Sequence, residues 1–355
     1  MDKNTLIGAL LIGAVLIGFT WFSKPDPTQS PAPSPQDTTQ LVTQAPAPVA
    51  GATVADSASL DSLGAPVLPP YLQPAQERIV ELKNEKLSVK LSTKGGAPVE
   101  AVLADYLDQS KKPVHLFRKG DARLDLPLRT LENRLVSTAD ANFSVVESTD
   151  STAVLRMQID DVAYLDYAYK LRPADYRVDL VIRGHELRRF LPVNIALQDI
   201  EWTQRIPQQE QSWKFEGQYS GVFPQGDVDR LETTSESSED VQETLRWVAF
   251  KDKYFSSALI ASATGFKDNK LSIKAAKEGS GYVRDCSFKG TFPISIKETE
   301  TVLPFTFFFG PNDYDLLRGY DAGVSKEEAL HLDHLVYLGM SVFRWINQYL
   351  IIPIV

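Results

Sequence analysis

The sequence predicts a mainly β protein built as a double-sheet sandwich. Between residues 76 and 311, apolar and polar residues alternate in many short runs, which is the pattern of half-buried antiparallel strands. Turn sequences such as KGGAP at 94–98 and RPAD at 172–175 separate the runs, and almost no helical period occurs between them. Runs this numerous predict one large sandwich domain of more than about 200 residues.

The expected strands follow directly from these runs. They fall at 87–91, 99–103, 143–146, 154–159, 164–171, 176–183, 195–202, 213–219, 247–250, 255–260, 271–273, 283–288, 292–296 and 302–309. The stretch 227–243 interrupts them, because acidic residues dominate it and Arg230 is its single basic residue. We expect a solvated loop or a short exposed helix there, and the acidic spacing matches no calcium loop.

Composition excludes several classes of function. The chain has 46 acidic and 37 basic residues and a net charge of −9, which argues against nucleic acid as a partner. Its single cysteine, Cys286, rules out an internal disulfide and a cysteine metal cluster. Nucleophile-elbow, phosphate-loop, dinucleotide and zinc-protease motifs are all missing from the sequence. We therefore expect no catalytic residue and no cofactor.

The four histidines do not predict a site on their own. His331 and His334 are three residues apart on an expected helix, within reach of one metal ion, but no third ligand is evident and no metal site is expected. His185 and Glu186 are adjacent in an expected strand, so they face opposite sides of the sheet and cannot act together as acid and base.

The N-terminal part predicts a membrane anchor and a spacer. Residues 6–22 are apolar and uncharged, and their length is at the short end of the range of about 17–25 residues that spans a bilayer. We interpret residues 1–23 as an uncleaved transmembrane signal-anchor with a cytoplasmic N-terminus. Residues 24–75 are rich in proline and alanine and predict a disordered linker.

The C-terminal part predicts helices that lead to a membrane surface. Residues 312–334 are expected to form two helices, one over 313–319 and one that begins at Ser325 in a capping box with Glu328. Residues 335–355 are expected to form an amphipathic interfacial helix and the start of a membrane segment, with packing against the domain's own core as the alternative. The expected membrane-interface residues are Leu338, Val342, Phe343, Arg344, Trp345, Ile346, Tyr349 and Leu350.

Four motifs in order resemble the YidC membrane-protein insertase family of Gram-negative bacteria. They are the start MDKNTLIGALLIG, the segment WVAFKDKYF at 247–255 with its W-x-x-x-K-x-x-Y-F pattern, the strand and Gly-Pro segment LPFTFFFGP at 303–311, and the stretch 333–355. The resemblance implies a periplasmic β-supersandwich, related to galactose-mutarotase-like domains, at residues 76–311. It also implies that the family's insertase core lies beyond Val355.

The same resemblance implies a non-enzymatic role and a set of partners. The family inserts, folds and assembles inner-membrane proteins, alone or beside the Sec translocon, so the implied partners are the lipid bilayer, Sec subunits and nascent membrane proteins. The implied location is the inner membrane, with the main domain in the periplasm. The alternative function is a membrane-anchored periplasmic carbohydrate-binding or mutarotase-like protein, which needs a cleft where histidine, carboxylates and aromatic platforms converge. A plain spacer domain is a third reading.

Overall fold

The computed structural model describes residues 68–226 and 236–336. The chain divides into two units at 56/57, and the described residues all belong to the second. The expected anchor at 1–23, nearly all of the expected linker and the eight expected membrane-interface residues lie outside the described residues. Among the described residues, no helix combines the length and the apolar character needed to cross a membrane.

The largest sheet in the described part has eight strands in the order β13-β15-β16-β19-β11-β10-β9-β8. In that order the strands are β13 Gly221–Pro224, β15 Trp247–Lys251, β16 Phe255–Ile260, β19 Glu300–Pro311, β11 Arg177–His185, β10 Tyr164–Leu171, β9 Thr152–Gln158 and β8 Ser144–Ser148. Every neighbouring pair is antiparallel.

A second sheet has five strands in the order β14-β17-β18-β12-β5, also antiparallel. These strands are β14 Ser237–Val241, β17 Lys267–Ala275, β18 Tyr282–Pro293, β12 Leu197–Pro207 and β5 Ala122–Asp125. Two smaller sheets complete the β structure: β1 Ile79–Lys83, β2 Leu87–Ser92, β3 Pro98–Leu107 and β4 Pro113–Phe117 in one, and β6 Pro127–Arg129 with β7 Leu135–Ser137 in the other.

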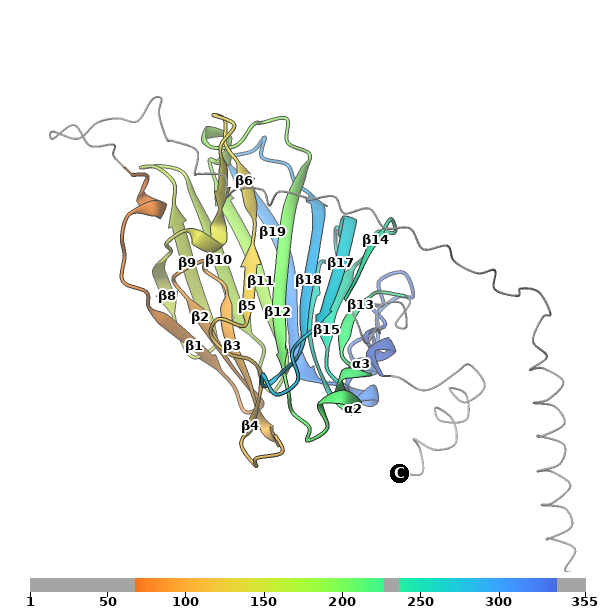
Figure 1. Ribbon diagram of the computed structural model, residues 1–355. Coiled ribbons are helices and arrows are strands. Elements are labelled where there is room, and N and C mark those ends of the chain that lie inside the picture. Colours follow the sequence, from red (N-terminus) through yellow and green to blue (C-terminus); the bar gives the residue numbers. More distant parts are fainter. Residues whose placement is uncertain (1–67, 227–235, 337–355) are drawn as a thin grey trace, which may run out of the picture. The chain divides into compact units, whose positions relative to one another are not determined.

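The helices of the described part are short. They are α2 Trp213–Gly217 and α3 Tyr314–Gly319, with 3₁₀ turns at η1 Pro70–Leu72, η2 Thr138–Asp140, η3 Leu187–Arg189 and η4 Leu332–Leu335. Figure 1 shows the strands of the eight-stranded and five-stranded sheets running in roughly the same direction, one sheet behind the other. This is the aligned packing of a β-sandwich, and the mainly β prediction is confirmed.

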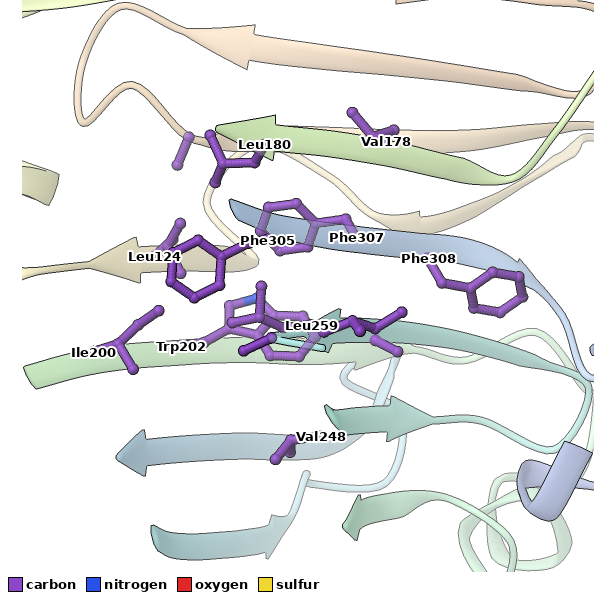
Figure 2. Close-up of a cluster of buried hydrophobic side chains, with 14 of the residues drawn as sticks. Leu124, Val178, Leu180, Ile200, Trp202, Val248, Leu259, Phe305, Phe307 and Phe308 are labelled. Atoms are coloured by element: carbon purple, nitrogen blue, oxygen red, sulfur yellow. The ribbon is translucent and has the colours of Figure 1, made fainter. Parts of the chain in front are cut away.

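The core lies between the two large sheets. The indole of Trp202 on β12 stacks on the ring of Phe250 on β15, with centroids 4.0 Å apart, and lies 6.1 Å from the ring of Phe307 on β19. Figure 2 shows Ile200 and Trp202 of β12 among side chains of β19, Phe305 and Phe307 included. These residues are buried, so the alternating apolar positions of both sheets meet in one layer.

The second half of β19 is buried on both faces: residues 307–311 are all buried, whereas Glu300, Val302 and Pro304 in its first half are exposed. Phe305 and Phe307 enter the sandwich core, whereas Phe308 packs edge-to-face against Tyr176 and Tyr320, and all three phenylalanines are at most 4% exposed. Tyr320 follows α3, so the chain after the last strand folds back and covers the outer face of the eight-stranded sheet at this point. A strand segment that is covered on both faces has a continuous run of apolar residues in its sequence, not an alternation of apolar and polar residues.

Two expected strand or loop assignments are wrong. The run 213–219 was expected as a strand, but residues 213–217 form helix α2, because the Ser212 hydroxyl accepts the Phe215 N–H and caps a helical turn. The stretch 227–243 was expected as a loop or an exposed helix, but Ser237–Val241 forms strand β14, which pairs along its length with β17. Cross-strand pairing outweighs the weak strand propensity of its serines and acids.

One expected helix is also absent from the described residues, although the short helix expected at 313–319 is confirmed as α3. The Ser325 hydroxyl does reach the Glu328 carboxylate at 3.1 Å, as the capping box requires. The guanidinium of Arg246 then binds the carbonyls of Glu327, Glu328 and Ala329, which a continuing helix would aim along its own axis. The chain therefore makes a turn and continues only as the 3₁₀ turn η4.

Candidate functional site: a trough on the five-stranded sheet

A cavity of about 590 Å³ lies on the face of the five-stranded sheet that points away from the core. All five strands contribute to it, so it crosses the sheet at an angle to the strands. We call it the trough, and it is lined by Gly120, Asp121, Ala122, Arg123, Thr203, Gln204, Arg205, Glu236, Ser237, Ser238, Ser272, Ile273, Lys274, Asp285, Cys286 and Ser287.

The floor of the trough is a row of short hydroxyl side chains. Strand register places Thr203 opposite Ser287, Ser287 opposite Ser272, and Ser272 opposite Ser238. The hydroxyls of Ser238 and Ser272 are hydrogen-bonded at 3.0 Å. Because residues directly opposite each other across strands share a face, these four side chains form one continuous line over four strands.

A row of long charged side chains runs beside the hydroxyl row. Two residues further along the strands, register aligns Arg205 with Asp285 and Asp285 with Lys274. The Arg205 guanidinium lies 3.0 Å from the Asp285 carboxylate, and the Lys274 amine lies 3.7 Å from that of Glu236. The hollow exists because short side chains stand next to long ones, and the paired charges leave its wall with no strong excess of either sign.

The end of the trough at β5 is fixed by further polar contacts. Arg123 binds both carboxylate oxygens of Asp140, which raises the pKa of Arg123 and lowers the pKa of Asp140. The Tyr282 hydroxyl donates to Asp121 at 2.7 Å, and this bond, with burial, raises the pKa of Tyr282. Arg205 lies over the Tyr282 ring at 3.8 Å. The wall is thus held in place before any ligand binds.

The chemistry of the trough suits binding rather than catalysis. Its hydroxyls have no histidine among the lining residues to act as a base. The Cys286 side chain is buried beneath the floor, and desolvation raises the pKa of its thiol far above the usual range, so the thiolate nucleophile is not available. What the trough offers is a line of neutral hydrogen-bond donors and acceptors.

A buried carboxyl pair lies within the segment 247–255 and the helix next to it. Glu216 of α2 accepts the backbone N–H groups of Gln209 and Glu210 at 2.8 and 3.2 Å, and the Ser220 hydroxyl donates to Asp252 at 2.8 Å. Burial, followed by the proximity of Asp252, raises the pKa of Glu216 to about 9. Burial also raises the pKa of Asp252. The pair fastens α2 to the turn between β15 and β16.

The same segment holds the chain that leads toward the C-terminus. The Trp247 indole N–H donates to the Leu330 carbonyl at 2.7 Å, next to the carbonyls that Arg246 binds. The Asp321 carboxylate accepts the backbone N–H groups of Leu330 and His331, each at 2.7 Å. We call residues 320–336 the joint. Its Leu332 and Leu335 side chains are buried, so the joint is part of the folded domain.

The histidines considered in the sequence fall into two places. His185 does not pair with Glu186 but binds Glu300 on β19 at 2.5 Å, and it stacks on Tyr164. It lines neither the trough nor the smaller cavities, each of about 10 Å³, around Gln204 and around Gln198. His331 and His334 lie in the joint, where the structure brings Asp333 beside them. Sequence reasoning missed the trough, whose residues are scattered over five strands.

The family model of the YidC periplasmic domain matches residues 79–352. The chain belongs to the YidC family. The membrane protein insertase YidC of Porphyromonas gingivalis is 45% identical over 99% of this chain, and that of Parabacteroides distasonis is 34% identical over all of it. The chain spans 58% of the length of each of these two relatives.

Solved structures of two kinds are similar to this member of the YidC family. A crystal structure of an active YidC insertase matches 79% of this chain and 49% of its own, with 10% identity and a TM-score of 0.33. A galactose mutarotase-like protein from Lactobacillus casei matches 65% of this chain and all of its own, with 10% identity and a TM-score of 0.41. The family resemblance seen in the sequence motifs is confirmed by the family model and the YidC relatives.

Proposed function

We propose that this chain is the anchor and periplasmic part of a membrane protein insertase and chaperone of the inner membrane. It serves the insertion, folding and assembly of membrane proteins, both with and without the Sec translocon, and it is not an enzyme. The proposal rests on the match to the YidC periplasmic domain and on relatives that carry the name membrane protein insertase. The N-terminus lies in the cytoplasm and the sandwich in the periplasm.

Within this role, the trough binds an extended polypeptide segment of a client or a translocon subunit. A hydroxyl row can donate to backbone carbonyls and accept from backbone amides of any sequence, and paired charges of both signs repel neither acidic nor basic segments strongly. The trough is open to solvent along the face of the sheet, so an extended chain can enter it without passing through a narrow end. Strand addition at the edge of β14 is the competing mode of binding.

Photocrosslinking tests this proposal and separates the two modes. A photoreactive amino acid at Ser272 or Ser287, introduced into the chain in inner-membrane vesicles, is expected to crosslink to a nascent inner-membrane protein or a Sec subunit. The control position is Val146 on β8, which is exposed at the far edge of the other sheet. Crosslinks from β14 alone would favour strand addition. Equal crosslinking from Val146 would contradict a specific role for the trough.

Filling the trough gives a second test. Ser272→Lys and Ser287→Lys place long side chains on its floor, and crosslinking from Thr203 is expected to fall. Ser148→Lys, at an exposed strand position on β8, is the matched control. If both kinds of variant crosslink as the unchanged protein does, the trough is not the binding site. The insertase role is tested separately, by the growth of cells that depend on the full-length protein.

The residues after the joint remain proposed as the second membrane contact. Arg344, Trp345 and Tyr349 have the composition of a helix at a lipid surface. A fluorophore on Tyr349→Cys in the full chain tests this contact, since the buried Cys286 is shielded from labelling. We expect a blue-shifted emission on adding liposomes, and an unchanged spectrum would contradict the interfacial helix.

A further inference from the structure

We propose that His331, Asp333 and His334 form a binding site for a divalent transition metal of the zinc class. One ligand atom from each of the three side chains lies within 4.8 Å of the others. The sequence showed the two histidines without a third ligand. The structure supplies that ligand, because the 3₁₀ turn η4 brings the carboxylate between them to the same side.

The backbone holds these three residues in a fixed turn. His331 has left-handed backbone angles (φ 54°, ψ 44°), which reverse the chain just before η4. As a result the imidazoles of His331 and His334 stack, with centroids 5.4 Å apart and planes at 18°. The buried Leu332 and Leu335 anchor the turn from below. A site on a turn fixed in this way loses little conformational entropy when it binds an ion.

The distances require only a small adjustment. Ligand atoms about 2.0–2.2 Å from a tetrahedral zinc ion lie about 3.4 Å from one another. The three atoms therefore need to approach by roughly an ångström, and side-chain rotation supplies this since the His331 side chain is 51% exposed. A tetrahedral ion with three protein ligands keeps a fourth position that a water molecule can take.

A carboxylate outside the trio supports one ligand. Oδ2 of Asp321 lies 3.9 Å from Nδ1 of His331 and accepts the His331 backbone N–H. The 3.9 Å gap is longer than a hydrogen bond. Once the ring rotates to close it, the carboxylate favours the tautomer that leaves the other nitrogen available to a metal, and hydrogen-bonded partners of this kind typically change affinity 10–100-fold. Asp321 is thus a positioning residue for this site.

The ligand set selects the class of metal. Two imidazole nitrogens and one carboxylate oxygen suit Zn²⁺, Co²⁺, Ni²⁺ or Cu²⁺, whereas Mg²⁺ and Ca²⁺ prefer oxygen ligands alone. Because the three ligands lie within four consecutive residues of the joint, the bound ion would stiffen the segment that leads out of the domain. The proposal does not depend on the role of the trough.

Titration of the full chain in detergent, without a histidine tag, tests the site. We expect one Zn²⁺ per chain, and the double variant His331→Ala/His334→Ala is expected to bind at least about 100-fold more weakly. His185→Ala is the matched control, since His185 lies on β11 away from the joint. Co²⁺ is expected to give the visible absorption of a low-coordinate nitrogen and oxygen site.

Two further measurements keep the test decisive. Asp321→Asn is expected to weaken Zn²⁺ binding about 10-fold or more. Its single amide oxygen keeps only one of the two backbone N–H bonds that the two carboxylate oxygens accept, so thermal unfolding without metal checks that each variant folds. Equal Zn²⁺ affinity in the unchanged protein and the double variant would overturn the proposal. So would Mg²⁺ or Ca²⁺ binding as tight as that of Zn²⁺.

Discussion

The indole N–H of Trp247 donates to the carbonyl oxygen of Leu330 at 2.7 Å, across 83 residues of sequence. Its neighbour Arg246 binds the three preceding carbonyls. Two consecutive side chains at the start of β15 therefore hold four consecutive carbonyls of the joint. This arrangement gives the tryptophan of the W-x-x-x-K-x-x-Y-F pattern a physical role, because it attaches the end of the domain to β15, the second strand from one edge of the eight-stranded sheet.

Arg246→Met is expected to loosen the joint without unfolding the sandwich. It removes three hydrogen bonds from a charged donor, each worth about 1.5–3 kcal/mol, although partial exposure reduces their sum. Hydrogen exchange of the Leu330 and His331 amides should therefore accelerate, while amides of β19 keep their protection. Arg188→Met removes an exposed pair with Glu186 and is the control. Unchanged exchange in the joint would show that Trp247 and Asp321 hold it without Arg246.

The stability of the domain is expected to fall as pH rises from about 4.5 to about 9. The pKa of Glu216 is raised from its ordinary 4.5 to about 9 in the folded state. The folded state therefore keeps a proton that the unfolded chain releases over this window, and the unfolding free energy decreases with pH. Asp252 acts in the same direction, because burial raises its pKa too.

Glu216→Gln tests this pH dependence. The amide oxygen can still accept a backbone N–H, but the side chain no longer titrates, so the urea midpoint should change less between pH 5 and pH 8.5 than in the unchanged protein. Glu147→Gln at an exposed position on β8 controls for the change in net charge. Parallel pH profiles for the unchanged protein and Glu216→Gln would contradict the raised pKa.

Trp202→Ala is expected to destabilise the sandwich by about 3–5 kcal/mol, since it opens a cavity between the two large sheets. Trp213→Phe is the comparison, because Trp213 is partly exposed and loses mainly one hydrogen bond to the Tyr282 carbonyl, worth about 1 kcal/mol. Urea unfolding of both variants measures the difference. Similar losses in the two would place the main core elsewhere.

A single buried water is expected between the sheets near Asp252. Oε1 of Gln204, Oδ2 of Asp252 and Oγ of Ser257 are buried, have no protein partner and line one cavity of about 10 Å³. One water molecule fits such a space and can serve all three atoms. A high-resolution crystal structure should show it, and Ser257→Val should cost about 1–3 kcal/mol. A dry cavity in the density would count against this.

Strands were predicted best where alternation of apolar and polar residues within the strand itself determines which side chains are buried. In β9 and β11 every second residue is buried, as their alternation indicated. The stretch at 213–219 alternates equally well, but the Ser212 cap and the buried Glu216 carboxylate fold it into α2. No local pattern distinguishes these outcomes, because the partners of Glu216 depend on how distant segments meet.

The trough was beyond prediction for a related reason. Thr203, Ser238, Ser272 and Ser287 are ordinary solvent-facing positions when each strand is read alone. They become a floor only through the register of four strands, and a shift of one residue in any of them would turn its hydroxyl to the other face. The third member of the His331 cluster likewise appeared only once the backbone turned at that histidine.

The position of β19 has a consequence for how the domain is made. Glu300–Pro311 lies between β16 and β11, so it joins the two halves of the eight-stranded sheet, yet every other strand of the described chain precedes it. Because the chain is synthesised from its N-terminus, the edges of both half-sheets stay unpaired until β19 has been made. The eight-stranded sheet is therefore completed in one late step. Incomplete chains that end before residue 300 should be the species that aggregate or are degraded.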